Sequence, residues 1–171
     1  SDGYWKLENM LVQRVSPPLE SRASKEMRGI VNEAAFRTFC SILTKRSAGE
    51  TITIRAAVET QIVDAIDYVG RLVPGLSIGL ESFDGECRHD TELLAQRLLD
   101  YFPSRDLTVL RPMFSGCCLI SACEGDVLEK DCLYEIKAGN RAFRITDLRQ
   151  LLVYSALAFS SGTLSFKKIG L

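Results

Sequence analysis

The chain has 171 residues, of which 46% are hydrophobic, and this is enough for one compact domain with its own apolar core. Its formal net charge of -1 excludes the overall basic field of a protein that binds nucleic acid across its whole surface, so any such contact must be local. No apolar run approaches the roughly 20 residues of a membrane helix and no signal-peptide pattern is present, so we expect a cytoplasmic protein with no membrane partner.

The first half of the chain is predicted to be helical. Ser24 is expected to cap a first helix, because apolar residues follow it at spacings of three and four. A second helix is predicted from Ile54 to Val73, before Pro74-Gly75, and a third from about Asp90 to Phe102, before Pro103.

The second half is predicted to form a sheet with one covering helix. Strands are expected at Leu107 to Phe114, Cys117 to Cys123, Val127 to Leu128, Cys132 to Lys137 and Thr163 to Ile169, because each segment is apolar and bounded by turn residues. Between the last two, Asp147 or Thr146 is expected to cap an amphipathic helix that reaches about Ser160.

These elements predict an α/β protein. The N-terminal segment covers residues 1–23, and a single domain is expected over 24–171, helical in 24–103 and with the sheet and its helix in 107–171. The chain could also be a fragment of a longer protein.

Six cysteines lie between Cys40 and Cys132, and reduced thiols are expected because they occur within apolar stretches. Zinc is not expected, since Cys117, Cys118 and Cys123 lack the paired CxxC spacing. Adjacent thiols in a strand would also point to opposite faces of the sheet.

Acidic and basic side chains gather around the predicted strand Cys132 to Lys137. The period of a strand places Glu135 and Lys137 on one face, and Asp126 follows Gly125 at the start of the neighbouring strand. Two carboxylates from adjacent strands and the backbone carbonyl of Ile136 are oxygen ligands suited to Mg²⁺ or Mn²⁺. Lys137 can orient a water molecule or offset charge that develops on a phosphate.

With Gln150 and Tyr154 on the following helix, this pattern resembles the PD-(D/E)XK nuclease superfamily, in particular its RecB-like branch with a QxxxY helix. The resemblance covers about the last third of the chain. It implies a restriction-endonuclease-like core with the succession α-β-β-β-α-β, a mixed sheet flanked by helices, and additional N-terminal helices. Gly125 stands where the superfamily name has proline.

The resemblance also implies roles for individual residues. Asp126 and Glu135 would bind the metal together with the carbonyl of Ile136, Lys137 would be catalytic, and Gln150 and Tyr154 would support the site and contact DNA. A further acidic ligand would come from Glu33 on the preceding helix. Iron-sulfur members of the RecB-like branch carry cysteines after the QxxxY helix, and this chain has none there, so no cluster is expected.

Three arginines follow the candidate catalytic strand: Arg141, Arg144 and Arg149. They could hold phosphates near the cleaved bond, or they could be solvated side chains around the start of a helix.

The expected function is therefore Mg²⁺-dependent hydrolysis of DNA, in a prokaryotic antiviral defence, restriction or repair system and with possible partner subunits or fused domains. One alternative is a catalytically inactive module of the same fold that binds nucleic acid or protein. Another is a toxin that cleaves RNA. If these residues form no site, Glu135 and Lys137 would be an exposed ion pair and Asp126 would lie in a turn.

Overall fold

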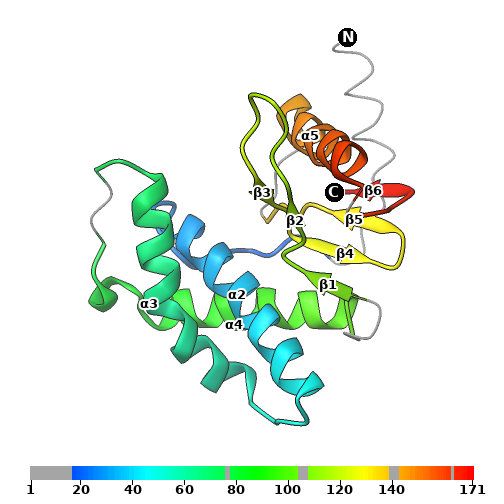
Figure 1. The fold of residues 1–171 in the computed structure, drawn as a ribbon. Helices are drawn as coiled ribbons and strands as arrows, with labels where there is room; N and C mark the ends of the chain where they lie inside the picture. Colours follow the sequence, from blue (N-terminus) through cyan, green and yellow to red (C-terminus); the bar gives the residue numbers. More distant parts are fainter. Residues whose placement is uncertain (1–16, 76–77, 104–107, 139–142, 163) are drawn as a thin grey trace. The chain divides into compact units, whose positions relative to one another are not determined.

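The computed structural model of the chain describes residues 17–75, 78–103, 108–138, 143–162 and 164–171. The chain divides into two compact units, a helical unit over Leu19–Arg105 and a sheet unit that includes Asp106–Leu171. Figure 1 shows the elements of both units. Within the described ranges, no helix has the length and apolar character that crossing a membrane requires.

The helical unit consists of three long helices around an apolar core. They are α2 (Arg28–Ser47), α3 (Ile54–Leu72) and α4 (Gly85–Tyr101), with the short 3-10 helix η1 (Leu80–Ser82) before α4. The predicted apolar stripe of the first helix is buried, and side chains from all parts of the unit meet it in one cluster: Ile30, Val31, Ala34, Val58, Ile62, Ala65, Phe83 and Cys87.

In the helical unit, two of the predicted helix starts were wrong. Ser24 lies in a turn, where its carbonyl accepts a hydrogen bond from the Met27 N–H at 3.1 Å, and α2 begins only at Arg28. The third helix begins at Gly85 instead of Asp90, because the side chain of Asp84 accepts a hydrogen bond from the Cys87 N–H at 2.9 Å and caps it.

The sheet unit contains a mixed sheet of four strands in the order β1-β4-β5-β6. These strands are β1 (Thr108–Leu110), β4 (Val127–Glu129), β5 (Cys132–Tyr134) and β6 (Lys168–Gly170). β4 pairs antiparallel with both β1 and β5, whereas β5 and β6 are parallel and are connected through α5 (Ile145–Ser161). A second, two-stranded sheet is formed by β2 (Met113–Phe114) and β3 (Cys123–Glu124).

Several predicted strands are shorter or interrupted. The first is broken into β1 and β2 at Arg111, whose φ of 51° is left-handed, and at Pro112. The predicted strand from Cys117 to Cys123 is mostly wrong, because only Cys123 belongs to a strand and Cys118 has a φ of 55°. Apolar composition alone did not distinguish a strand from the turn of a hairpin.

One face of the sheet is covered by α5. Leu128 and Leu133 from the sheet pack in one buried cluster with Leu151, Tyr154 and Leu157 from α5. The helix begins at Ile145, so neither Thr146 nor Asp147 is its N-cap. Asp147 is its third residue, and its Oδ2 accepts a hydrogen bond from the Arg144 N–H at 2.8 Å, which satisfies a free donor at the helix start.

Candidate active site

Asp126 and Glu135 lie at the same end of the β4-β5 hairpin. Val127 is paired with Tyr134, so the next pair along the antiparallel register is Asp126 with Glu135. Asp126 immediately precedes β4 and Glu135 immediately follows β5. The Ile136 N–H donates to Asp126 Oδ2 at 2.6 Å, and this bond joins the two segments beyond the strands.

The two carboxylates belong to the face of the sheet that α5 covers. Side chains alternate along a strand, so Glu135 shares a face with Leu133, and Asp126 shares one with Leu128. Both leucines pack against α5. The sheet thereby directs its acidic pair toward the helix that carries Gln150 and Tyr154.

Lys137 connects the end of β5 with this helix. Its Nζ donates to Glu135 Oε1 at 2.6 Å and to Gln150 Oε1 at 3.0 Å, and Gln150 Nε2 donates to the Tyr154 hydroxyl at 2.6 Å. Gln150 and Tyr154 are four residues apart on α5, the spacing at which helical side chains meet. Four of the residues predicted to form the site are therefore in one hydrogen-bonded chain.

Tyr154 is held in place by its ring as well as by its hydroxyl. The ring is stacked on Phe114 with centroids 5.0 Å apart and an angle of 4° between the planes. Burial raises the pKa of Tyr154 far above its usual value, and the negative charges of Glu135 and Asp126 raise it further. Both carboxylates thus lie within electrostatic reach of the phenol, which stays protonated at neutral pH.

Phe114 is a positioning residue that sequence reasoning missed. It lies on β2 and is completely buried. No sequence pattern identifies it, because the stack joins β2 to a helix that begins about thirty residues later and depends on the tertiary fold.

Glu135 is a buried carboxylate with one unpaired oxygen. The residue is 5% exposed, and Oε1 accepts from Lys137, whereas the buried Oε2 has no hydrogen-bond partner among the described residues. A buried carboxylate oxygen without a partner is costly, so such an atom indicates a place for an ion or a water molecule.

The oxygen atoms at this position are of the type that a hard divalent cation binds. Asp126 and Glu135 offer carboxylate oxygens, and the Ile136 backbone lies beside Asp126. In the described part of the chain, no group of three or more His, Cys, Asp or Glu side chains is arranged to hold a metal. Mg²⁺ is usually held by one or two carboxylates together with waters and substrate phosphate oxygens, so the pair of carboxylates fits this ion.

Glu33 belongs to the other compact unit. It lies on α2, where Arg37 Nε donates to its Oε1 at 2.6 Å and completes an ion pair within one helical turn. The role of Glu33 as a further ligand stays a prediction.

The predicted phosphate-binding arginines lie around the start of α5. Arg144 is the N-cap residue and Arg149 is on the helix, and both are exposed. Arg141 lies outside the described residues. Their contact with phosphates remains a prediction.

The geometry of these residues is the basis on which a function can be assigned, because comparisons with protein-family models, curated proteins and solved structures gave no match to this chain.

Proposed function

We propose that this protein is a nuclease that hydrolyses DNA phosphodiester bonds with Mg²⁺ or Mn²⁺. The single observation that supports it best is the group around Lys137. Its ammonium is hydrogen-bonded to both Glu135 and Gln150, beside a buried carboxylate oxygen that has no partner among the described residues. Burial of the second carboxylate oxygen without a partner costs stability, and a bound cation would offset that cost.

Asp126 and Glu135 would hold the cation through their carboxylate oxygens. When bound, Mg²⁺ or Mn²⁺ supplies positive charge that polarises a phosphate and makes a water molecule more acidic. The Ile136 N–H donates to Asp126 Oδ2 and so fixes the orientation of that carboxylate relative to Glu135.

Lys137 would supply positive charge on the protein side of the reaction. Its side chain is 21% exposed, so Nζ can reach a phosphate oxygen or a water molecule while Glu135 and Gln150 restrict its position. A lysine held in this way is preorganised to offset the negative charge that develops on the phosphate. Such electrostatic stabilisation is usually the largest contribution of these groups to the rate.

Gln150 and Tyr154 would position Lys137. The amide of Gln150 has two ends, and here the oxygen accepts from Lys137 while the nitrogen donates to the Tyr154 hydroxyl. Since Tyr154 is stacked on buried Phe114, the chain of hydrogen bonds ends on a rigid part of the core.

The order of the strands is one argument for proposing a restriction-endonuclease-like core. The strands β1, β4 and β5 are antiparallel neighbours in one sheet, and α5 then leads to β6, which is parallel to β5. The hairpin of β2 and β3 lies between β1 and β4 in the chain. The resemblance of the Asp126, Glu135, Lys137 and QxxxY residues to PD-(D/E)XK nucleases suggests a role in prokaryotic defence, restriction or repair.

The test is a cleavage assay on double-stranded and single-stranded DNA, with RNA in parallel, in Mg²⁺, in Mn²⁺ and in chelator. We expect metal-dependent cleavage of DNA that is lost in Asp126→Asn and Glu135→Gln. The matched controls are Asp131→Asn and Glu129→Gln, at the opposite end of the same hairpin, and they should retain the activity. Cleavage that persists in Glu135→Gln would contradict the proposal, and cleavage of RNA alone would support a toxin instead.

A second function is a module of the same fold that binds DNA without cutting it. The observation that favours it is the small number of candidate metal ligands in the described part of the chain, where no three acidic, cysteine or histidine side chains gather. DNA binding measured by fluorescence anisotropy in Mg²⁺, with no product over long incubation, would identify this function.

A further inference from the structure

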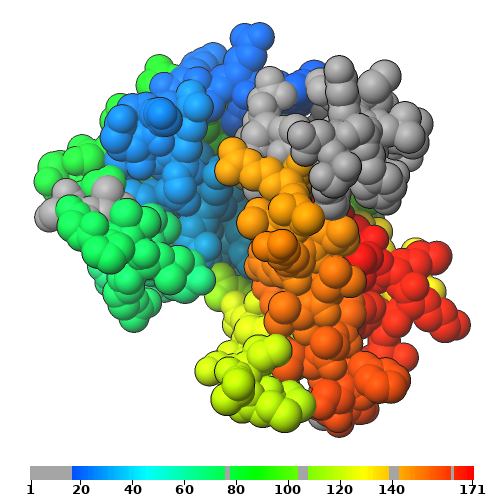
Figure 2. All heavy atoms as spheres, turned by 90° about the horizontal axis from the view of Figure 1, so that it is seen from above, coloured from blue at the N-terminus to red at the C-terminus, as the bar shows by residue number. Residues whose placement is uncertain are grey.

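A pair of cysteines lies at the turn of the hairpin between β2 and β3. The Cys117 N–H donates to the Ile120 carbonyl at 2.9 Å and the Ile120 N–H donates to the Cys117 carbonyl at 3.0 Å. Cys118 and Leu119 are therefore the two residues of the turn, and Leu119 is fully exposed. We call residues 117–120 the hairpin tip, and Figure 2 shows it at the surface beside the C-terminal end of α5.

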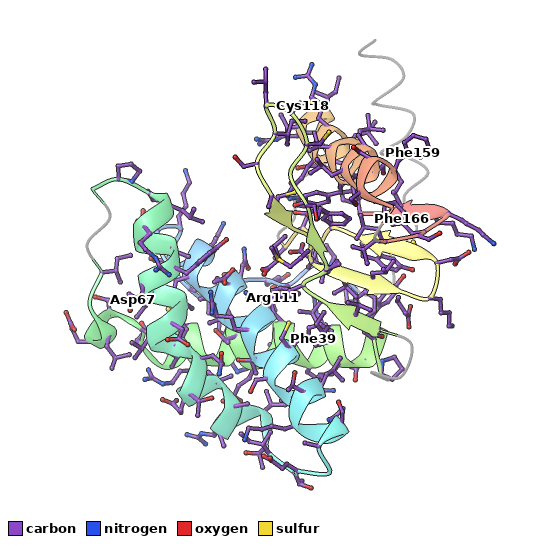
Figure 3. All side chains as sticks on the ribbon, in the orientation of Figure 1. Phe39, Asp67, Arg111, Cys118, Phe159 and Phe166 are labelled. Atoms are coloured by element: carbon purple, nitrogen blue, oxygen red, sulfur yellow. The ribbon has the colours of Figure 1, made fainter. Side chains whose placement is uncertain are left out.

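The expectation that adjacent cysteines point to opposite faces was wrong for this pair. It assumed a strand, whereas Cys118 has a left-handed φ of 55°. The Sγ atoms of Cys117 and Cys118 are consequently only 3.7 Å apart. Cys118 is exposed, and Figure 3 labels it at the end of the hairpin.

A residue of α5 is directed at the same pair. Ser160 Oγ donates to Cys117 Sγ at 3.1 Å. This hydrogen bond and one from the Cys118 thiol lower the pKa of Cys117, since both stabilise the thiolate. Thiolates, not thiols, are the forms that bind metals.

The separation of the two sulfurs is the one that a tetrahedral ion requires. Zn²⁺ binds thiolates at about 2.3 Å, and two such bonds at a tetrahedral angle place the sulfurs about 3.8 Å apart. We propose that Cys117 and Cys118 chelate a soft divalent cation of the Zn²⁺ class at the hairpin tip. Each thiol gives up its proton to solvent as its sulfur bonds to the ion, and water or a ligand from solution takes the remaining positions.

Chelation is favoured over a disulfide between the same residues. Adjacent Cα atoms joined by a trans peptide are about 3.8 Å apart, below the roughly 4.4 to 6.8 Å found in most disulfides. No described peptide bond is cis. A shared ion tolerates the observed geometry, whereas a disulfide would require the hairpin tip to distort.

This site is distinct in its chemistry from the carboxylates of the candidate active site. Asp126 and Glu135 offer oxygen atoms to a hard ion, whereas the hairpin tip offers sulfur to a soft one. The proposal therefore does not depend on nuclease activity.

The test is titration of Cd²⁺, a spectroscopic substitute for Zn²⁺, into the reduced full chain. We expect thiolate-to-metal charge-transfer absorption that saturates at about one ion per chain, release of about two protons per ion, and displacement by excess Zn²⁺. Cys117→Ser and Cys118→Ser should each abolish the absorption. Cys40→Ser, a cysteine of the helical unit, should leave it unchanged.

Ser160→Ala provides a variant that keeps both sulfurs. It should weaken Cd²⁺ binding about tenfold and move its onset to higher pH, because the thiolate loses a donor. Circular dichroism of each variant shows whether the fold is kept, and Cys118→Ala replaces Cys118→Ser if that variant unfolds. Wild-type absorption in the Cys117→Ser and Cys118→Ser double variant, or none in the wild type, would overturn the proposal.

Discussion

In the proposed function, Glu135 serves both stability and metal binding. Its Oε1 is paired with Lys137, and this contact offsets part of the free energy that burial of a carboxylate costs. Its Oε2 is buried without a partner among the described residues. The ion pair therefore stabilises one oxygen of the carboxylate, and the other is the oxygen that we propose binds the metal.

Lys137→Ala tests whether this ammonium acts on the reaction. We expect kcat for Mg²⁺-dependent DNA cleavage to fall about 10²- to 10³-fold, since one group that offsets developing charge is removed. The control is Lys168→Ala, an exposed lysine whose contact with Asp131 is long, at 3.9 Å. Equal losses of activity in both variants, measured as initial rates, would show that Lys137 has no particular role.

Tyr154→Phe tests the raised pKa of the phenol. A raised pKa means that the folded protein keeps a proton that the unfolded chain loses first, so stability is present below about pH 10 and declines above it. We expect the free energy of unfolding of the wild type to fall more steeply above this pH than that of Tyr154→Phe, which retains the stack on Phe114.

The measurement is urea denaturation at a series of alkaline pH values. At neutral pH the same variant should be less stable by about 1 kcal/mol, because the hydrogen bond from Gln150 is lost. Tyr101→Phe, at an exposed position of α4, serves as the control and should follow the wild type. Parallel curves for wild type and Tyr154→Phe would refute the assignment.

At the scale of elements, α4 is tied to the segment before α2 by one buried carboxylate. Asp90 Oδ2 accepts from Ser21 Oγ at 2.8 Å, from the Arg22 N–H at 2.8 Å and from the Ala23 N–H at 3.0 Å. Asp90 is 1% exposed. The apolar spacing of the sequence predicted the helix α4. It could not predict that Asp90 binds the segment before α2, because this contact is polar and joins residues far apart in the chain.

Asp90→Ala should therefore destabilise the helical unit. The expected loss is about 3 kcal/mol, because two backbone donors and a hydroxyl lose a charged acceptor in a buried position. Asp100→Ala, on the same helix and exposed, should change stability by less than about 0.5 kcal/mol. Thermal and urea unfolding followed by circular dichroism distinguish the two, and similar values for both would contradict this account.

The hairpin of β4 and β5 contains a strained turn. Lys130 has a φ of 55°, a conformation that costs a residue with a side chain roughly 1–2 kcal/mol and glycine much less. Because glycine also loses more entropy on folding, Lys130→Gly should stabilise the protein by about 0.5 kcal/mol. Differential scanning calorimetry would show a higher Tm, whereas Lys168→Gly, at a strand position, should lower it.

At the scale of the whole molecule, charge sets how strongly nucleic acid can be attracted. A net charge of -1 leaves no general positive field, so binding must come from a few local contacts. Arg144 and Arg149 at the start of α5 are the described residues that we expect to supply them.

The affinity for DNA should consequently depend only weakly on salt. Two or three phosphate contacts predict that log Kd rises with log salt with a slope of about 2 to 3, and Arg149→Ala should lower this slope by about 1. Fluorescence anisotropy on the Lys137→Ala variant would measure binding without cleavage. A slope near 8 would indicate a far larger basic surface than the charge allows.

Much of the fold could be predicted from local sequence. The apolar spacing of α2 and α3 and the prolines after the helices indicate the helical half, and alternation around Glu135 indicates the strand that leads to it. Boundaries were predicted less well, since the side chains of Asp84 and Asp147 each accept a single hydrogen bond at a helix start, and other polar residues nearby could do the same.

The sequence by itself determined that the chain is α/β, because this depends on local periodicity, and its resemblance to PD-(D/E)XK nucleases indicated Asp126, Glu135, Lys137, Gln150 and Tyr154 as one candidate site. Only the tertiary structure decided that Lys137 joins Glu135 to Gln150, that Phe114 holds Tyr154, and that two adjacent cysteines face one another. The physical reason is that these contacts depend on how strands, turns and helices pack against one another. That packing is determined jointly by residues that are far apart in the chain.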